Sequence, residues 1–229
     1  MGKRRLIGKI VILMLGLAAV VILAANSDTI PVSTPKKGYR VVIDPGHGGS
    51  DCGAVGVSGV KEAGLNLAVS LYLKEELEAL GMEAILTRSD ERALAEGKKA
   101  DMAARGKIMN GEGVDLVVSV HVNKFTDPSV HGPMAFYMKG SAEGEKLAKT
   151  VIDSITDELG APRRIANPGD YYVIRESMPV SVLVECGFLS NSGDEALLQQ
   201  EQHQKKLAHA IARGIFSYFE GDLGRKPLD

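Results

Sequence analysis

Apolar residues follow two alternating patterns along most of the chain. Short runs rich in β-branched residues are typical of buried strands, and longer stretches with apolar residues at every third or fourth position are typical of amphipathic helices. The predicted strands are 41–43, 83–87, 115–120, 134–138 and 180–184, and the predicted helices are 62–80, 101–109, 141–159 and 200–219. Strands that alternate with helices favour a single three-layer α/β domain, in which helices cover both faces of a mostly parallel sheet.

The N-terminal 37 residues lack this alternation. An uninterrupted apolar run of sixteen residues, 10–25, follows four basic residues. This order predicts a signal peptide or an N-terminal signal anchor over 1–27, with the basic flank inside and the remainder exported. A spanning helix needs about 20 apolar residues and a secretory core about 15, so both alternatives stay open. Residues 28–37 then form a short tether.

Charge narrows the range of partners. The chain has 27 basic and 29 acidic residues, and four of the basic ones but none of the acidic ones lie in the first 27 positions. The exported part therefore carries 23 basic and 29 acidic residues, a formal charge of −6. This balance disfavours polyanionic partners, so we expect no nucleic-acid binding.

Reactive side chains stand at the ends of three predicted strands. His47 follows the first strand in a glycine-rich turn, His121 follows the third, and Glu185 follows the last. Because the carboxyl ends of parallel strands meet at one edge of a sheet, these side chains are expected to converge. Glu62 begins the helix after the His47 turn, although a carboxylate there also interacts favourably with a helix N-terminus.

Two histidines and one glutamate are a ligand set typical of a catalytic zinc, which keeps one position open for water. Glu185 would then act as the general base. Asn123 is a candidate for a hydrogen bond to substrate, or equally for capping a loop. His131 precedes Gly-Pro and is expected to be a loop residue, with a role as substitute ligand or substrate contact as the alternative.

The sequence allows three chemical states for the two cysteines of the chain. Cys52 lies five residues after His47, and Cys186 adjoins Glu185, so both should lie near the site. In an exported chain they could form a disulfide, supply a thiolate ligand, or stay as two buried thiols. A thiolate ligand is the least favoured, because it would occupy the open coordination position that hydrolysis requires.

Substrate recognition is predicted to rest on polar contacts. Aromatic residues make up only 5% of the chain and tryptophan is absent, which leaves few rings to stack on sugars. Residues 163–172 and 175–178 show neither apolar pattern and are predicted to be loops. Loops of this kind commonly contact substrates.

Four motifs, in order, link the chain to a known family. They are IDPGHGGSDCGAVG around His47, Glu62 followed by LNLAV, SVHVN around His121, and LVECGFLSN around Glu185. With these motifs the chain resembles the zinc-dependent N-acetylmuramoyl-L-alanine amidases of the amidase 3 type, although Cys52 stands where that family usually has proline. The resemblance implies a catalytic domain over 38–221, followed by a polar tail over 222–229. It also implies Zn²⁺ held by His47, Glu62 and His121, with Glu185 catalytic.

The same resemblance implies hydrolysis of the amide between N-acetylmuramic acid and L-alanine in peptidoglycan, by an extracytoplasmic enzyme that is secreted or membrane-anchored. A short chain without wall-binding repeats is most similar to the germination-specific spore cortex amidases of endospore formers. This implies a role in cortex maturation, through muramic lactam formation, or in wall remodelling, with an activating or recruiting protein partner as an option. The alternatives are another zinc amidohydrolase on peptidoglycan, either a peptidase or a deacetylase, and a non-catalytic wall-binding protein.

Overall fold

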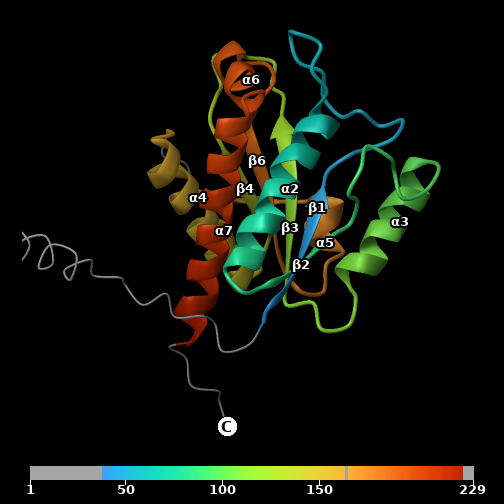
Figure 1. Ribbon diagram of the computed structural model, residues 1–229, viewed down its shortest axis with the longest axis vertical. Coiled ribbons are helices and arrows are strands. Elements are labelled where there is room, and N and C mark those ends of the chain that lie inside the picture. The colour runs from blue at the N-terminus through green and yellow to red at the C-terminus, as the bar shows by residue number, and fades with distance from the viewer. Residues whose placement is uncertain (1–37, 163–164, 224–229) are drawn as a thin grey trace, which may run out of the picture. The chain divides into compact units, whose positions relative to one another are not determined.

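A six-stranded sheet with the strand order β2-β1-β3-β6-β4-β5 forms the middle layer of the fold (Figure 1). The computed structural model describes residues 38–162 and 165–223, so the predicted signal segment, tether and most of the predicted polar tail lie outside the described residues. The strands are β1 (Arg40–Pro45), β2 (Glu83–Leu86), β3 (Leu116–Asn123), β4 (Met134–Met138), β5 (Asn167–Gly169) and β6 (Val180–Phe188).

Most of the sheet is parallel, as the sequence predicts. β1 pairs in parallel with β2 and β3, and β3 pairs in parallel with β6. β4 runs antiparallel to β6 and parallel to β5. The carboxyl ends of β1, β3 and β6 therefore lie at one edge of the sheet, where polar groups can gather.

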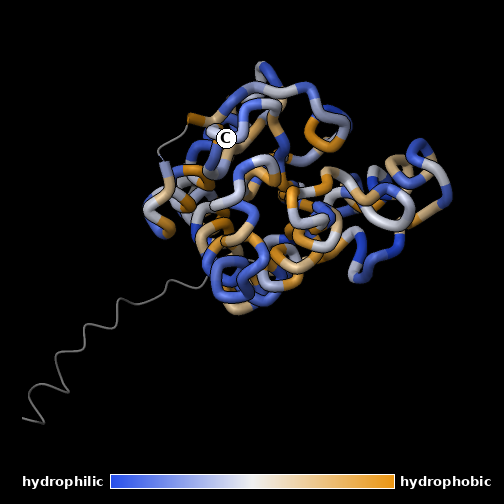
Figure 2. Tube along the Cα trace, turned by 90° about the horizontal axis from the view of Figure 1, so that it is seen from above, coloured by the Kyte–Doolittle hydropathy of each residue, from blue (hydrophilic) through white to orange (hydrophobic). Residues whose placement is uncertain are grey.

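Helices cover both faces of the sheet, which confirms the predicted three layers. They are α2 (Glu62–Ala79), α3 (Lys98–Met109), α4 (Ala142–Leu159), α5 (Tyr172–Arg175), α6 (Ser192–Leu198) and α7 (Glu201–Leu223). α7 packs between α2 and α4 over the larger hydrophobic core, whereas α3 and α5 lie over the smaller one. Figure 1 shows α2 and α7 side by side with α3 apart from them, and Figure 2 shows apolar segments gathered in the interior.

Successive residues of β6 face opposite cores, and this alternation positions the site. Val182 and Val184 lie in the larger core, and Leu183 lies in the smaller one. Glu185 is the next residue on the face of Leu183, and His121 is its partner in the register of β3 and β6. Beyond the end of the smaller core, this face of the sheet opens into a cavity.

The structure corrects three local predictions. β5 and α5 lie in the stretch predicted to be loop, and α6 was not predicted at all. These elements have only three, four and seven residues, too few to establish a hydrophobic period. His121 and Glu185 lie within β3 and β6, not after them. In the part of the chain that the structure describes, no helix is long and apolar enough to cross a membrane.

Candidate metal centre

The turn after β1 carries His47 in a left-handed backbone conformation, with φ of 63°. The turn is tied to β3 by the Gly46 backbone N–H, which donates to the Val120 carbonyl at 3.0 Å. A Cβ at Gly46 would lie 2.2 Å from Cε1 of the His121 ring. Only glycine at this position lets the turn pass so close to the imidazole.

Glu62 is held by the loop that precedes α2. The backbone N–H groups of Glu62 and Ala63 donate to the carbonyls of Ala54 and Cys52, so the loop backbone caps the helix where no side chain does. In return, Glu62 Oε2 accepts a hydrogen bond of 2.8 Å from the Ala54 N–H. A Cβ at Gly53 would lie 2.5 Å from the same oxygen. This packing leaves Glu62 only 4% exposed.

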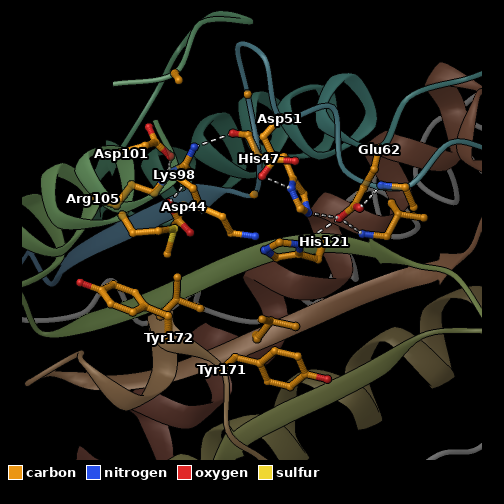
Figure 3. Close-up of a pocket in the computed structure, with 18 of the residues that line it drawn as sticks. Asp44, His47, Asp51, Glu62, Lys98, Asp101, Arg105, His121, Tyr171 and Tyr172 are labelled. Carbon is orange, nitrogen blue, oxygen red and sulfur yellow. Dashed lines mark hydrogen bonds and ion pairs between the residues drawn. The ribbon is translucent and has the colours of Figure 1, made fainter. Parts of the chain in front are cut away.

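His47, Glu62 and His121 converge on one point (Figure 3). Glu62 Oε1 lies 3.2 Å from His47 Nε2 and 2.9 Å from His121 Nδ1. One ligand atom from each residue lies within 4.8 Å of the other two. Two imidazoles and one carboxylate at this spacing fit a zinc ion with an open coordination position. The described residues offer no cysteine or further histidine to this group.

The contacts within the cluster shift the pKa values of Glu62 and His47. Burial would raise the pKa of Glu62, but hydrogen bonds with His121 and His47 bring it well below its ordinary value. Burial would lower the pKa of His47, but its contacts with Glu62 and Asp51 raise it. Glu62 is therefore an anion at neutral pH, as a metal ligand must be.

Asp51 supports His47 from the side away from Glu62. Its Oδ2 lies 3.0 Å from His47 Nδ1, so the other ring nitrogen faces the cluster. A carboxylate on the second nitrogen of a metal-binding histidine fixes the orientation of the ring. Asp51 lies four residues after His47 in the same motif but follows no predicted strand, so it was not among the predicted site residues.

Glu185 lies beside the cluster but outside it. Its side chain is almost fully buried, and its Oε2 has no hydrogen-bond partner among the described residues. Burial raises the pKa of Glu185, with a smaller contribution from nearby Glu62, whereas His121 and His47 oppose the shift, and the resulting pKa is about 7. A buried carboxyl with a free oxygen and a pKa near neutrality is suited to accepting and returning a proton.

A cavity of about 710 Å³ joins these groups to α3 and α5. Its lining includes Lys98, Met102, Tyr171 and Tyr172, so residues near the stretch predicted as loop do reach the site. The Tyr171 ring packs edge-on against Phe136, with centroids 5.1 Å apart. Figure 3 shows both tyrosines on the side of the site away from His47.

The other candidate residues are placed as follows. Asn123 lines the cavity and its Oδ1 also accepts a hydrogen bond from the Lys124 N–H, so it caps the loop while facing the site. His131 is exposed, and its Nδ1 lies 2.9 Å from the Ser129 carbonyl oxygen. Cys52 and Cys186 are free thiols, and only Cys186 is buried.

The chain matches a known protein family over most of its length. The family model Amidase_3, described as N-acetylmuramoyl-L-alanine amidase, matches residues 41–217. The chain is 33% identical over 203 residues to the germination-specific N-acetylmuramoyl-L-alanine amidase of Bacillus subtilis strain 168, a match covering 85% of each chain.

Two solved structures share the fold at similar identity. The CwlD amidase from Clostridioides difficile, solved in complex with the GerS lipoprotein, matches with a TM-score of 0.77 and 31% identity, over 81% of this chain and 100% of that one. The catalytic domain of CwlV, an N-acetylmuramoyl-L-alanine amidase from Bacillus (Paenibacillus) polymyxa var. colistinus, matches with a TM-score of 0.72 and 33% identity, over 80% and 98% of the two chains.

Proposed function

The chain belongs to the N-acetylmuramoyl-L-alanine amidase family, and we propose that it hydrolyses the amide between N-acetylmuramic acid and L-alanine in peptidoglycan with a zinc ion held by His47, Glu62 and His121. The observation that carries this proposal is the convergence of these three ligand atoms within 4.8 Å of one another. When bound, zinc would polarise the scissile carbonyl and lower the pKa of water. The two-nitrogen, one-oxygen donor set is the reason to propose zinc over a harder cation such as Mg²⁺, which prefers oxygen ligands.

Glu185 is proposed as the general base and acid. Its carboxylate takes a proton from the attacking water and then passes that proton to the nitrogen of the departing L-alanine amine. A pKa of about 7 suits both steps near neutral pH. Its position on a strand of the central sheet holds the carboxylate at a fixed place beside the ligand cluster. Asn123, on the cavity wall, is proposed to hydrogen-bond the substrate.

Digestion of purified peptidoglycan tests this function. Zinc-loaded protein should generate two new ends that mass spectrometry detects. One is a stem peptide with a free N-terminal L-alanine, and the other is a muramic acid with a free lactyl carboxylate. Free acetate would indicate a deacetylase, and cuts within the stem peptide would indicate a peptidase. Binding to the polymer without any bond cleavage would favour a wall-binding protein.

The cellular setting is proposed from the relatives and the N-terminal sequence. The Bacillus subtilis relative is named as germination-specific, which supports a role in spore cortex maturation, with general wall remodelling as the alternative. Both roles need an exported enzyme. A reporter active only outside the cytoplasm, fused after residue 37, should show activity. Alkaline extraction of membranes then separates an anchor, which is retained, from a cleaved signal peptide.

A protein partner is proposed on a single observation. The Clostridioides difficile relative was solved in complex with a lipoprotein, so we expect this chain to be recruited or activated by an exported protein. If the purified zinc-loaded protein alone digests cortex peptidoglycan at a rate that added spore membrane proteins do not raise, an activating partner is not needed.

A further inference from the structure

Arg88, just after β2, is a buried arginine whose guanidinium hydrogen-bonds, among the described residues, to backbone carbonyls alone. The residue is 4% exposed. Its Nε donates to the Pro45 carbonyl at 3.0 Å, one terminal nitrogen donates to the Asp90 carbonyl at 2.8 Å, and the other donates to the Gly46 and Ala63 carbonyls at 2.8 Å each. All five N–H groups of an arginine are fixed in one plane, so these four acceptors are held in a defined arrangement.

Two of the four carbonyls belong to segments that carry metal ligands. Gly46 precedes His47, and Ala63 follows Glu62. The same guanidinium nitrogen of Arg88 binds both carbonyls. It therefore joins the turn after β1 to the first turn of α2, two segments that come from different parts of the fold.

A neighbouring side chain makes a parallel link. Asn66 Nδ2 donates to the Gly46 carbonyl at 3.2 Å and to Glu62 Oε1 at 3.1 Å. The Gly46 carbonyl is thus a shared acceptor between Arg88 and Asn66. Both links connect the backbone before His47 to the residues around Glu62.

The charge of Arg88 is not neutralised by direct contact with a carboxylate in the described residues, since all its acceptors are carbonyl oxygens. Burial and the positive charge of Arg105 lower the pKa of Arg88, the carboxylates of Asp44, Asp101 and Asp90 oppose the shift from a distance, and the resulting pKa is about 10. Arg105 differs, because Asp44 and Asp101 contact its guanidinium at 2.8 Å and 2.7 Å. The direct partners of Arg88 are therefore backbone carbonyls, two of them next to proposed metal ligands, and its counter-charges act without contact.

We propose that Arg88 is a positioning residue that fixes the separation of His47 and Glu62 and thereby sets the affinity of the site for zinc. The inference rests on the proposed zinc function. Lysine cannot substitute for Arg88 here. Its three N–H donors are all on one nitrogen atom, so they cannot reach four carbonyls that lie around a plane.

The test compares Arg88→Lys with Arg92→Lys. Arg92 lies on the same loop, is 87% exposed and pairs with Asp90, so it is a matched control outside the site. The zinc dissociation constant is measured by chelator competition, the ligand geometry by the visible spectrum of the Co²⁺-loaded protein, and the zinc-free fold by thermal melting. Arg88→Lys should weaken zinc binding by about 10- to 100-fold and alter the Co²⁺ spectrum, as loss of outer support for ligands does. Arg92→Lys should change neither.

The outcomes separate this inference from the proposed function. Unchanged zinc affinity and Co²⁺ spectrum in Arg88→Lys, with only a lower melting temperature, would show that Arg88 merely supports the scaffold and would overturn the inference. A wild-type protein that binds no zinc would overturn the proposed function itself. If Arg88→Lys does not fold, Arg88→Gln takes its place, because it places no charge in the interior. Its amide has only two N–H donors for the four carbonyls, so the same losses are expected.

Discussion

His121 and Glu185 are direct partners in the register of the parallel strands β3 and β6. Partners on adjacent strands lie about 4.8 Å apart and project from the same face of a sheet. Backbone pairing therefore fixes the spacing between a proposed ligand and the proposed base. Because both residues lie in paired strands, the backbone of the proposed base cannot move away from the proposed ligand without a break in the central sheet.

The first prediction concerns this base. Glu185→Gln keeps the shape of the side chain and removes the proton acceptor, so amide cleavage should fall at least about a hundredfold. Zinc content, measured by mass spectrometry of the metal, should stay at the wild-type level because Glu185 is not among the three clustered ligands. Near-normal turnover would reject Glu185 as the base, and loss of zinc would make it a ligand.

The second prediction is a pH dependence of stability in the zinc-free protein. The pKa of Glu185 is raised from 4.5 to about 7 in the fold, so between these values the folded state binds more protons than the unfolded state. The free energy of unfolding then falls as pH rises through this window, by about 3 kcal/mol for this residue. Glu185→Gln removes that loss.

Urea unfolding of both zinc-free proteins at about pH 5 and about pH 8 measures the difference. The variant should gain stability over the wild type at the higher pH and not at the lower one. Parallel pH profiles for the two proteins would show that Glu185 titrates near its ordinary value in the fold.

The third prediction concerns the ligands. Alanine at His47, Glu62 or His121 should each lower zinc occupancy sharply, because two protein ligands rarely hold a catalytic zinc. His131→Ala is the control and should keep wild-type zinc, since His131 lies outside the cluster. Chelation of wild-type protein should abolish activity and lower its melting temperature, and added zinc should restore both. Zinc loss in His131→Ala but not in Glu62→Ala would mean the ligand set is misassigned.

The fourth prediction uses two glycines 18 positions apart. A Cβ at Gly46 would overlap the His121 ring, so Gly46→Ala should displace this ligand and lower zinc affinity. Gly64, in the first turn of α2, has no atom within 4 Å of a new Cβ, and Gly64→Ala should raise the free energy of unfolding by about 0.5–1 kcal/mol. Calorimetric zinc titration and denaturant unfolding distinguish the two. Wild-type zinc affinity in Gly46→Ala would show that the turn can move away from β3.

The sequence predicted the long elements well, because each has many positions at which a period can repeat. The predicted helix over 62–80 is α2 (Glu62–Ala79), and the predicted helix over 141–159 is α4 (Ala142–Leu159). The short elements β5, α5 and α6 were missed for the opposite reason. The antiparallel direction of β4 also carried no local signal, since strand direction depends on how the chain returns to the sheet.

The site was only partly predictable. Strand ends and the glycine-rich turn indicated His47, His121 and Glu185, and the structure brings them together with Glu62. The residues that support them were not indicated. Arg88 acts on backbone carbonyls that are distant in sequence, and such contacts leave no pattern in a single chain. Asp51 had a weak signal, since a carboxylate near a candidate metal-binding histidine is a natural second partner for its ring.

The proposed metal ligands come from the turn after β1, from α2 and from β3, whereas Glu185 comes from β6, sixty-four positions after His121. The proposed metal ligands and the proposed base are thus encoded in separate stretches of the gene. On these proposed roles, a single codon change at Glu185 would leave a stable domain with all three proposed ligands in place. Duplicated copies of such a gene have a short mutational route from wall-cutting enzyme to wall-binding module, because losing catalysis need not disturb the fold.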